Sequence, residues 1–75
     1  MDIKTGKGRK FVKDGSIYNY VTTWANIVLG RVVHDPDTNK YKAEKMDREI
    51  NDFVVVSSKH RDHYSAAKSL VSAIG

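Results

Sequence analysis

"SSKHRDHYSAAKSLVSAIG", residues 57–75, has the pattern of a helix with one apolar face. Ser57 or Ser58 is a good N-cap, because a serine hydroxyl can accept a hydrogen bond from a free amide of the first helical turn. Gly75 can end the helix, since a helix end commonly requires a left-handed residue. The apolar positions recur three or four residues apart, which is the spacing of a single helical face: Tyr64, Ala67, Leu70, Val71 and Ile74.

The chain before this helix reads as a series of strands. Asp14-Gly15 separates two strand-like stretches and is typical of a two-residue hairpin turn, because both turn positions need a positive φ angle. Further strand-like stretches are "TTWANIVLGRVVH", the polar "KYKAEKM" and the short apolar "FVVVS", separated by the turn "DPDTN" and the loop "DREIND". We expect "FVVVS" to be a buried strand. The apolar face of the helix needs a partner, and a sheet is the large surface that the sequence offers. We therefore predict an α+β fold, an antiparallel sheet of three to four strands with one C-terminal helix packed on one face.

The length of 75 residues indicates one domain with a small core, since a chain of this size buries only about 60% of its unfolded surface. Residues 1–8 hold two glycines and little apolar content, so we expect a flexible basic arm there and a single domain over residues 9–75. The absence of cysteine excludes disulfides and is compatible with a reducing compartment. No apolar run approaches the roughly 18 residues of a membrane span, and the start lacks the apolar stretch of a signal peptide. We expect a cytoplasmic protein without a membrane partner.

Positive charge is concentrated at the two ends of the chain. The net charge is +4, and residues 16–58 hold five basic residues against six acidic ones, so the excess lies outside that range. Basic surfaces attract polyanions, and Arg, Lys and hydroxyl groups suit phosphate oxygens. On the helix, Arg61, Ser65, Lys68 and Ser72 form a polar stripe of this composition, although every surface helix has a solvated face. The predicted nucleic-acid-binding residues are Lys4, Lys7, Arg9, Lys10, Lys13, Lys59, Arg61 and Lys68.

Residues 58–71 also resemble the last helix of double-stranded RNA-binding domains. Ser58-Lys59-His60, followed by Ala66-Ala67, is similar to the Ser-Lys-Lys and Ala-Ala positions of that family. The resemblance implies phosphate contacts from Lys59, His60 and His63. Histidine replaces lysine at two of these three positions, and residues 1–15 contain no counterpart of the first helix of the family.

The predicted hairpin divides its side chains between two faces. One face carries Phe11, Tyr18 and Tyr20 with neighbouring cations, and the other carries Val12, Ile17 and Val21. If the aromatic face is open, its rings are candidate residues for stacking on unpaired bases: Phe11, Tyr18 and Tyr20. If the aromatic face is covered, these rings form the core, and the need of a small domain for aromatic burial favours this arrangement. Strand alternation alone leaves both arrangements open.

Other chemistry finds little support in the sequence. His34, His60 and His63 could approach one another, but the spacing more often places such residues at the rim of a core, so we predict no metal site and no cofactor. "DPDTNK" starts like a calcium loop, yet Lys40 stands where glycine is needed. A domain with one thin core can hardly enclose a catalytic pocket, so we expect no enzyme.

The leading interpretation is a small non-catalytic nucleic-acid-binding protein that contacts phosphates through the arm, the hairpin and the helix. The alternative is a small inhibitor or adaptor, of the kind that viruses and mobile elements encode against a host nuclease or defence enzyme, that docks on an acidic protein surface. The sequence does not distinguish DNA from RNA, and it leaves the oligomeric state open.

Overall fold

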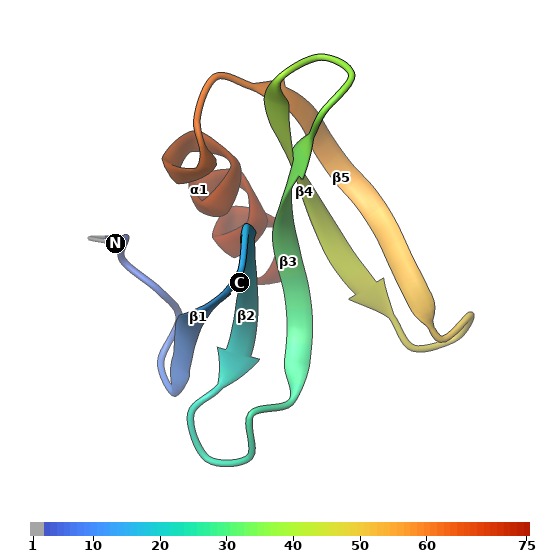
Figure 1. The fold of residues 1–75 in the computed structure, drawn as a ribbon. Helices are drawn as coiled ribbons and strands as arrows, with labels where there is room; N and C mark the ends of the chain where they lie inside the picture. Colours follow the sequence, from blue (N-terminus) through green and yellow to red (C-terminus); the bar gives the residue numbers. More distant parts are fainter. Residues whose placement is uncertain (1–2) are drawn as a thin grey trace.

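The computed structural model describes residues 3–75, which form an antiparallel sheet of five strands followed by one helix (Figure 1). The strands lie in the sheet in their chain order, so each is joined to the next by a hairpin. The helix crosses one face and contacts β3, β4 and β5. The elements are β1 (Arg9–Asp14), β2 (Ile17–Thr22), β3 (Val28–Asp35), β4 (Lys40–Asp47), β5 (Asp52–His60) and α1 (His63–Ile74).

The α+β class and the single C-terminal helix are confirmed, whereas the prediction of three to four strands was too low. Each strand-like stretch of the sequence joins the same meander. The long stretch "TTWANIVLGRVVH" contributes a turn as well as a strand, because Asn26 adopts a positive φ of 53° and its amide bonds to the Thr22 carbonyl oxygen at 2.9 Å. Trp24 lies in this turn and is 75% exposed.

The first hairpin turns one residue later than predicted. Asp14 pairs with Ile17, so Gly15 and Ser16 are the two turn residues. Only Gly15 has a positive φ, 61°, which matches a type II′ turn with glycine at its first central position. The shift moves each cross-strand partner by two positions: a turn at Asp14-Gly15 would pair Phe11 with Tyr18, whereas Phe11 faces Tyr20. A shift of two preserves the side-chain faces, so the predicted division of the hairpin into two faces holds.

The helix begins at His63, later in the chain than expected from Ser57 or Ser58 as the N-cap. Its N-cap is Asp62, whose Oδ1 accepts a hydrogen bond from the Ser65 amide at 2.8 Å. Residues 57–60 belong to β5, where Ser57 pairs with Ala43. Gly75 is the C-cap, as predicted, and its amide donates to the Val71 carbonyl oxygen. The positions of the double-stranded RNA-binding resemblance therefore do not share a helix, since Lys59 and His60 lie in a strand.

The core lies between α1 and the face of the sheet that the helix covers. Its fully buried members are Tyr20, Val32, Ala43, Ala66, Ala67 and Leu70. The small alanines at the contact allow the helix to approach the sheet closely. Of the predicted helical stripe, Ala67 and Leu70 are buried, while Val71 and Ile74 pack at the rim and Tyr64 is 43% exposed.

The prediction of a buried strand at "FVVVS" was wrong. β5 is an edge strand, because it pairs with β4 on one side and is the last strand of the sheet. Val54, Val55 and Val56 are all exposed. A continuous apolar run is typical of a strand covered on both faces, and here the helix covers one face of the sheet only.

Residues 3–8, the described part of the predicted arm, pass beside the helix and the core. Ile3 packs against the core cluster, and the Gly6 amide donates a hydrogen bond to the Tyr20 hydroxyl at 2.9 Å. Thr5 Oγ1 donates to the Arg9 carbonyl oxygen at 2.9 Å. Within residues 3–75, no helix has both the length and the apolar character required to cross a membrane.

Candidate nucleic-acid interface

One lysine from each basic end of the sequence contributes to the same surface. Lys4 and Lys68 both line a shallow depression of about 360 Å³ between the arm and the outer side of α1. We call this the arm–helix surface, and its lining residues are Ile3, Lys4, Tyr64, Lys68, Val71 and Ser72. Among residues 3–75, this lining contains two cations, two groups with hydroxyls and no carboxylate. Such a composition suits a phosphate-bearing ligand.

The helix presents its half of this surface because its opposite side is buried. Ala66, Ala67 and Leu70 face the sheet, so Lys68 and Ser72, one turn apart, point outward. The Lys68 ammonium lies 5.5 Å from the centre of the Tyr64 ring, within the range of a cation–π contact. No acidic residue follows Asp62 in the chain, so α1 itself contributes no negative side chain beyond its N-cap.

The arm presents Lys4 because its neighbours are fixed on the protein. Ile3 packs on the core, and the hydrogen bond from Gly6 to Tyr20 lies two residues further along. A cation held between two anchored residues loses less conformational entropy on binding than one on a free tail. The pairing of Lys4 with Lys68 therefore depends on the fold, and not only on the charge of the two segments.

Arg9 has a different role from the other predicted cations. Its Nη1 donates a hydrogen bond to the carbonyl oxygen of Gly75, at the C-terminal end of α1. That end of a helix carries partial negative charge, so a guanidinium there is stabilising. Arg9 thereby links the start of β1 to the end of the helix, and this contact occupies part of its hydrogen-bonding capacity.

The remaining predicted cations are distributed over other parts of the surface. Lys7 is exposed in the arm, and Lys13 is exposed near the tip of the first hairpin. Lys10 alternates with Arg9 and Phe11 along β1 and so points to the face away from the helix. Lys59 and Arg61 are exposed at the end of β5, at the opposite edge of the sheet from β1. The structure thus brings Lys4 and Lys68 together and leaves the others apart.

The aromatic residues proposed for base stacking lie on the face that the helix covers. Tyr20 has no exposed surface, and the Phe11 ring stacks on it at a centroid distance of 4.7 Å. The Tyr18 ring stacks on His63 of the helix at 4.9 Å. This placement favours the arrangement in which the three rings build the core. Tyr64, at 43% exposure beside Lys68, is the aromatic ring that the arm–helix surface offers instead.

A charged cluster on the uncovered face of the sheet was not foreseen. Arg31 Nε and Glu44 Oε1 lie 2.6 Å apart, and the Arg31 guanidinium stacks 3.8 Å from the centre of the Phe53 ring. Lys42 Nζ lies 4.0 Å from the other Glu44 oxygen. The opposite charges at cross-strand positions 31 and 44 could have indicated the pair once the β3–β4 register was known. Glu44 offsets the two cations, so this cluster is a poor site for a polyanion.

The three histidines make separate contacts. His34 Nε2 lies 2.9 Å from Asn39 Oδ1, and the His63 ring lies between Tyr18 and Tyr41. The His60 nitrogens lie 2.8 Å from Ser57 Oγ and 3.0 Å from Ser65 Oγ. Over residues 3–75, no three His, Asp or Glu side chains gather in a group that could hold a metal ion.

The pair formed by Ser57 and His60 has the residue types of a nucleophile and its base. The Ser57 hydroxyl, however, lies 2.7 Å from that of Ser69 on α1, so it joins β5 to the helix. Neither residue lines the arm–helix surface or a second depression, bordered by Leu29, Val54 and Ile74 beside the end of α1. We interpret this network as a contact that docks the helix on the edge strand.

Comparisons with protein-family models, curated proteins and solved structures found no match for this chain.

Proposed function

We propose that this protein is a small cytoplasmic, non-catalytic nucleic-acid-binding protein whose contact surface is centred on the arm–helix surface. The observation that carries the proposal is the position of Lys4 and Lys68 on one depression beside an exposed tyrosine, with no carboxylate among the lining residues. Lys7, in the same arm, extends the positive charge. Lys59 and Arg61 form a separate positive area that a longer ligand would reach.

Each component of the arm–helix surface has a part in this proposal. Lys4 and Lys68 would contact phosphate oxygens, and the Ser72 hydroxyl would donate a further hydrogen bond. The Tyr64 ring is exposed enough to stack on an unpaired base, since aromatic rings beside cations are a common platform for single strands. The shallow depression cannot enclose a base, so we expect weak sequence preference.

Fluorescence anisotropy with a labelled single-stranded DNA, a single-stranded RNA and a duplex tests the proposal at about 50 mM salt, where electrostatic binding is strong. We expect binding by the wild type and a clear loss for the Lys4→Gln/Lys68→Gln variant. The matched control is Lys40→Gln/Lys45→Gln, which removes the same charge from exposed positions of β4. Absence of binding to all three probes, or equal losses for the two variants, would contradict the proposal.

The second candidate is an inhibitor or adaptor that docks on another protein. The observation that favours it is the uncovered face of the sheet, on which Val12 and Val55 are 40% and 48% exposed. A protein partner should remain bound to the tagged chain after nuclease treatment of a lysate, and substitutions at Lys4 and Lys68 should not release it. A nucleic-acid binder should lose its retained material under that treatment.

A further inference from the structure

The second edge of the sheet is apolar, exposed and unpaired. Among residues 3–75, β5 pairs with β4 alone, so no described strand pairs with the backbone groups on its other side. Four of the seven large apolar side chains exposed in the described part of the chain lie in the stretch 50–56. They are Ile50, Val54, Val55 and Val56. An exposed edge of this kind is a template for pairing with another strand.

β1, the strand at the other edge of the same sheet, is protected against pairing with a strand of another molecule. β1 reads RKFVKD, so four of its six residues are charged. Lysine side chains on an edge strand oppose the approach of a second strand. β5, in contrast, has no charged residue from position 53 to position 58. The two edges of one sheet thus differ in the feature that controls strand addition.

The available part of β5 is its first half. Asp52 to Val55 pair regularly with β4, whereas the register shifts between Val55 and Ser57. Lys59 adopts a positive φ of 60°, which bends the second half of the strand. A bulge interrupts regular pairing, so backbone pairing with a partner is confined to the first half of β5, and the charged end of the strand lies beyond the paired stretch. The regular, unprotected stretch is centred on Val54.

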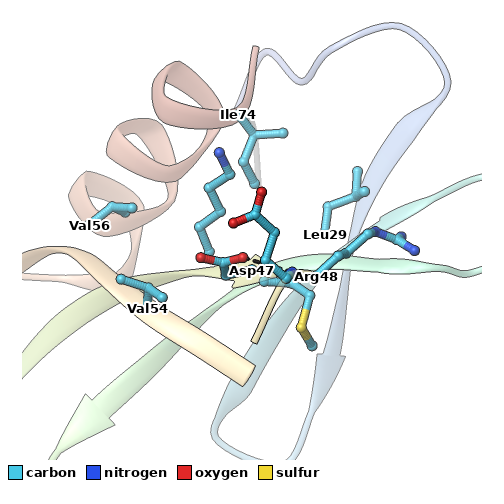
Figure 2. Close-up of a pocket in the computed structure, with 9 residues that line it drawn as sticks. Leu29, Asp47, Arg48, Val54, Val56 and Ile74 are labelled. Atoms are coloured by element: carbon cyan, nitrogen blue, oxygen red, sulfur yellow. Dashed lines mark hydrogen bonds between the residues drawn. The ribbon is translucent and has the colours of Figure 1, made fainter. Parts of the chain in front are cut away.

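Both faces of this stretch carry valine side chains. Val54 and Val56 border a depression of about 620 Å³ beside the end of α1, with Leu29 and Ile74 on its other side (Figure 2). The lining of this depression also includes charged residues, namely Lys45, Asp47, Arg48 and Glu49. Val55 lies on the uncovered face of the sheet, opposite Glu44. A strand added at this edge would therefore bury apolar surface on both faces in addition to forming backbone hydrogen bonds.

The charges around β5 indicate what kind of strand fits. The turn before β5 is acidic, with Asp47, Glu49 and Asp52 around Arg48. The segment at its far end is basic, with Lys59 and Arg61. In an antiparallel pair of two β5 strands, the acidic end of one copy lies beside the basic end of the other. The strand is thus complementary in charge to a second copy of itself.

We propose that β5 pairs with β5 of a second copy of this chain, antiparallel about a two-fold axis at Val54. Val54 then faces its own copy, and Phe53 faces Val55. The interface is isologous, and the two sheets become continuous. Only a short stretch of β5 is regular enough to pair, whereas a stable complex commonly buries roughly 1,200–2,000 Å², so we expect a weak dimer that depends on concentration.

Sedimentation equilibrium over a wide range of protein concentration is the first test. We expect the mean mass of the wild type to rise above the 8.5 kDa of one chain. Val54→Lys places two like charges opposite each other and should stay at the monomer mass. The control is Val12→Lys, at a position of the β1 edge with nearly the same exposure, 40% against 42%, and it should behave as the wild type.

A single-cysteine variant tests the register and does not depend on the lysine variant being folded. The chain contains no cysteine, so Val54→Cys and Val12→Cys each introduce the only thiol. Under oxidation Val54→Cys should form a disulfide-linked dimer much faster than Val12→Cys. A wild type that remains monomeric at every concentration overturns the proposal, and the occupant of the edge would then be an extended segment of another protein. Equal crosslinking of the two variants also overturns it.

Discussion

The hydroxyl group of Tyr20, a residue with no exposed surface, accepts a hydrogen bond from the backbone amide of Gly6 at 2.9 Å. The bond connects the centre of the core to the segment that precedes β1. Its acceptor is fixed by packing, because the Tyr20 ring lies against Phe11 and faces Gly30 across the sheet. The position of Lys4 beside the helix therefore depends partly on a core residue.

Replacing Tyr20 by phenylalanine should loosen the arm without opening the core. The variant removes one hydrogen bond and leaves the Gly6 amide without its acceptor, so we expect the free energy of unfolding to fall by about 1 kcal/mol. Chemical denaturation measures this change, and hydrogen exchange should show a faster Gly6 amide. The control is Tyr18→Phe, whose hydroxyl makes none of the hydrogen bonds found among residues 3–75. A Gly6 amide that exchanges at the wild-type rate in Tyr20→Phe would contradict the assigned bond.

Gly30 should tolerate no side chain. A Cβ atom at this position would lie 2.7 Å from the backbone oxygen of Glu44 and 2.8 Å from Leu70 Cδ1. Because the first obstacle is backbone, we expect Gly30→Ala to destabilise the fold by about 1–3 kcal/mol. Leu70→Ala alone should cost about 2–5 kcal/mol, through the cavity that it creates.

The two substitutions should couple, because Leu70→Ala removes one of the atoms that Gly30→Ala meets. Thermal or chemical unfolding of the two single variants and the double variant gives the interaction energy. We expect the double variant to be more stable than the sum of the single losses implies. Strict additivity would show that α1 does not lie against Gly30 as described.

The helix start can be tested with a pair of capping variants. Asp62→Ala removes the side chain that accepts from the Ser65 amide, and the loss of an N-cap costs about 1 kcal/mol. Ser58→Ala should change the stability by a few tenths of a kcal/mol at most, because Ser58 is an exposed residue of β5. Denaturation curves give the free energy of unfolding of the two variants. A larger loss of stability for Ser58→Ala than for Asp62→Ala would contradict Asp62 as the N-cap and indicate that the helix begins at the serines.

The sequence predicted the end and the buried side of the helix better than its start. Ala67 and Leu70 follow the helical spacing of the apolar residues, and the sheet covers the face on which they lie. Gly75 ends the helix through its own backbone freedom. The start was ambiguous because Ser57, Ser58 and Asp62 all have side chains that can cap a helix. Pairing with β4 keeps residues 57–60 extended, and local propensity carries no information about that pairing.

Long-range contacts that local sequence does not reveal also determine which face of the sheet is covered and where the candidate site lies. Alternation separated Tyr20 from Val12 correctly, but only the position of the helix shows that the tyrosine side is covered. The pairing of Lys4 with Lys68 depends on the packing of Ile3 and on the Gly6–Tyr20 bond, neither of which has a local sequence signal. What the composition could indicate was that both ends of the chain are basic.

The salt dependence of binding should report Lys4 and Lys68 individually. In a plot of the logarithm of the binding constant against the logarithm of the salt concentration, each phosphate contact by a lysine adds about 0.7–0.9 to the magnitude of the negative slope. Lys4→Gln and Lys68→Gln should each reduce the magnitude of this slope by about that amount, and the double variant by about twice as much. Anisotropy titrations at several salt concentrations measure the slopes, with Lys40→Gln as the control for an exposed lysine outside the arm–helix surface. If the lysines of this surface make no phosphate contact, all four variants will keep the wild-type slope, and the interface must then be sought at Lys59 and Arg61.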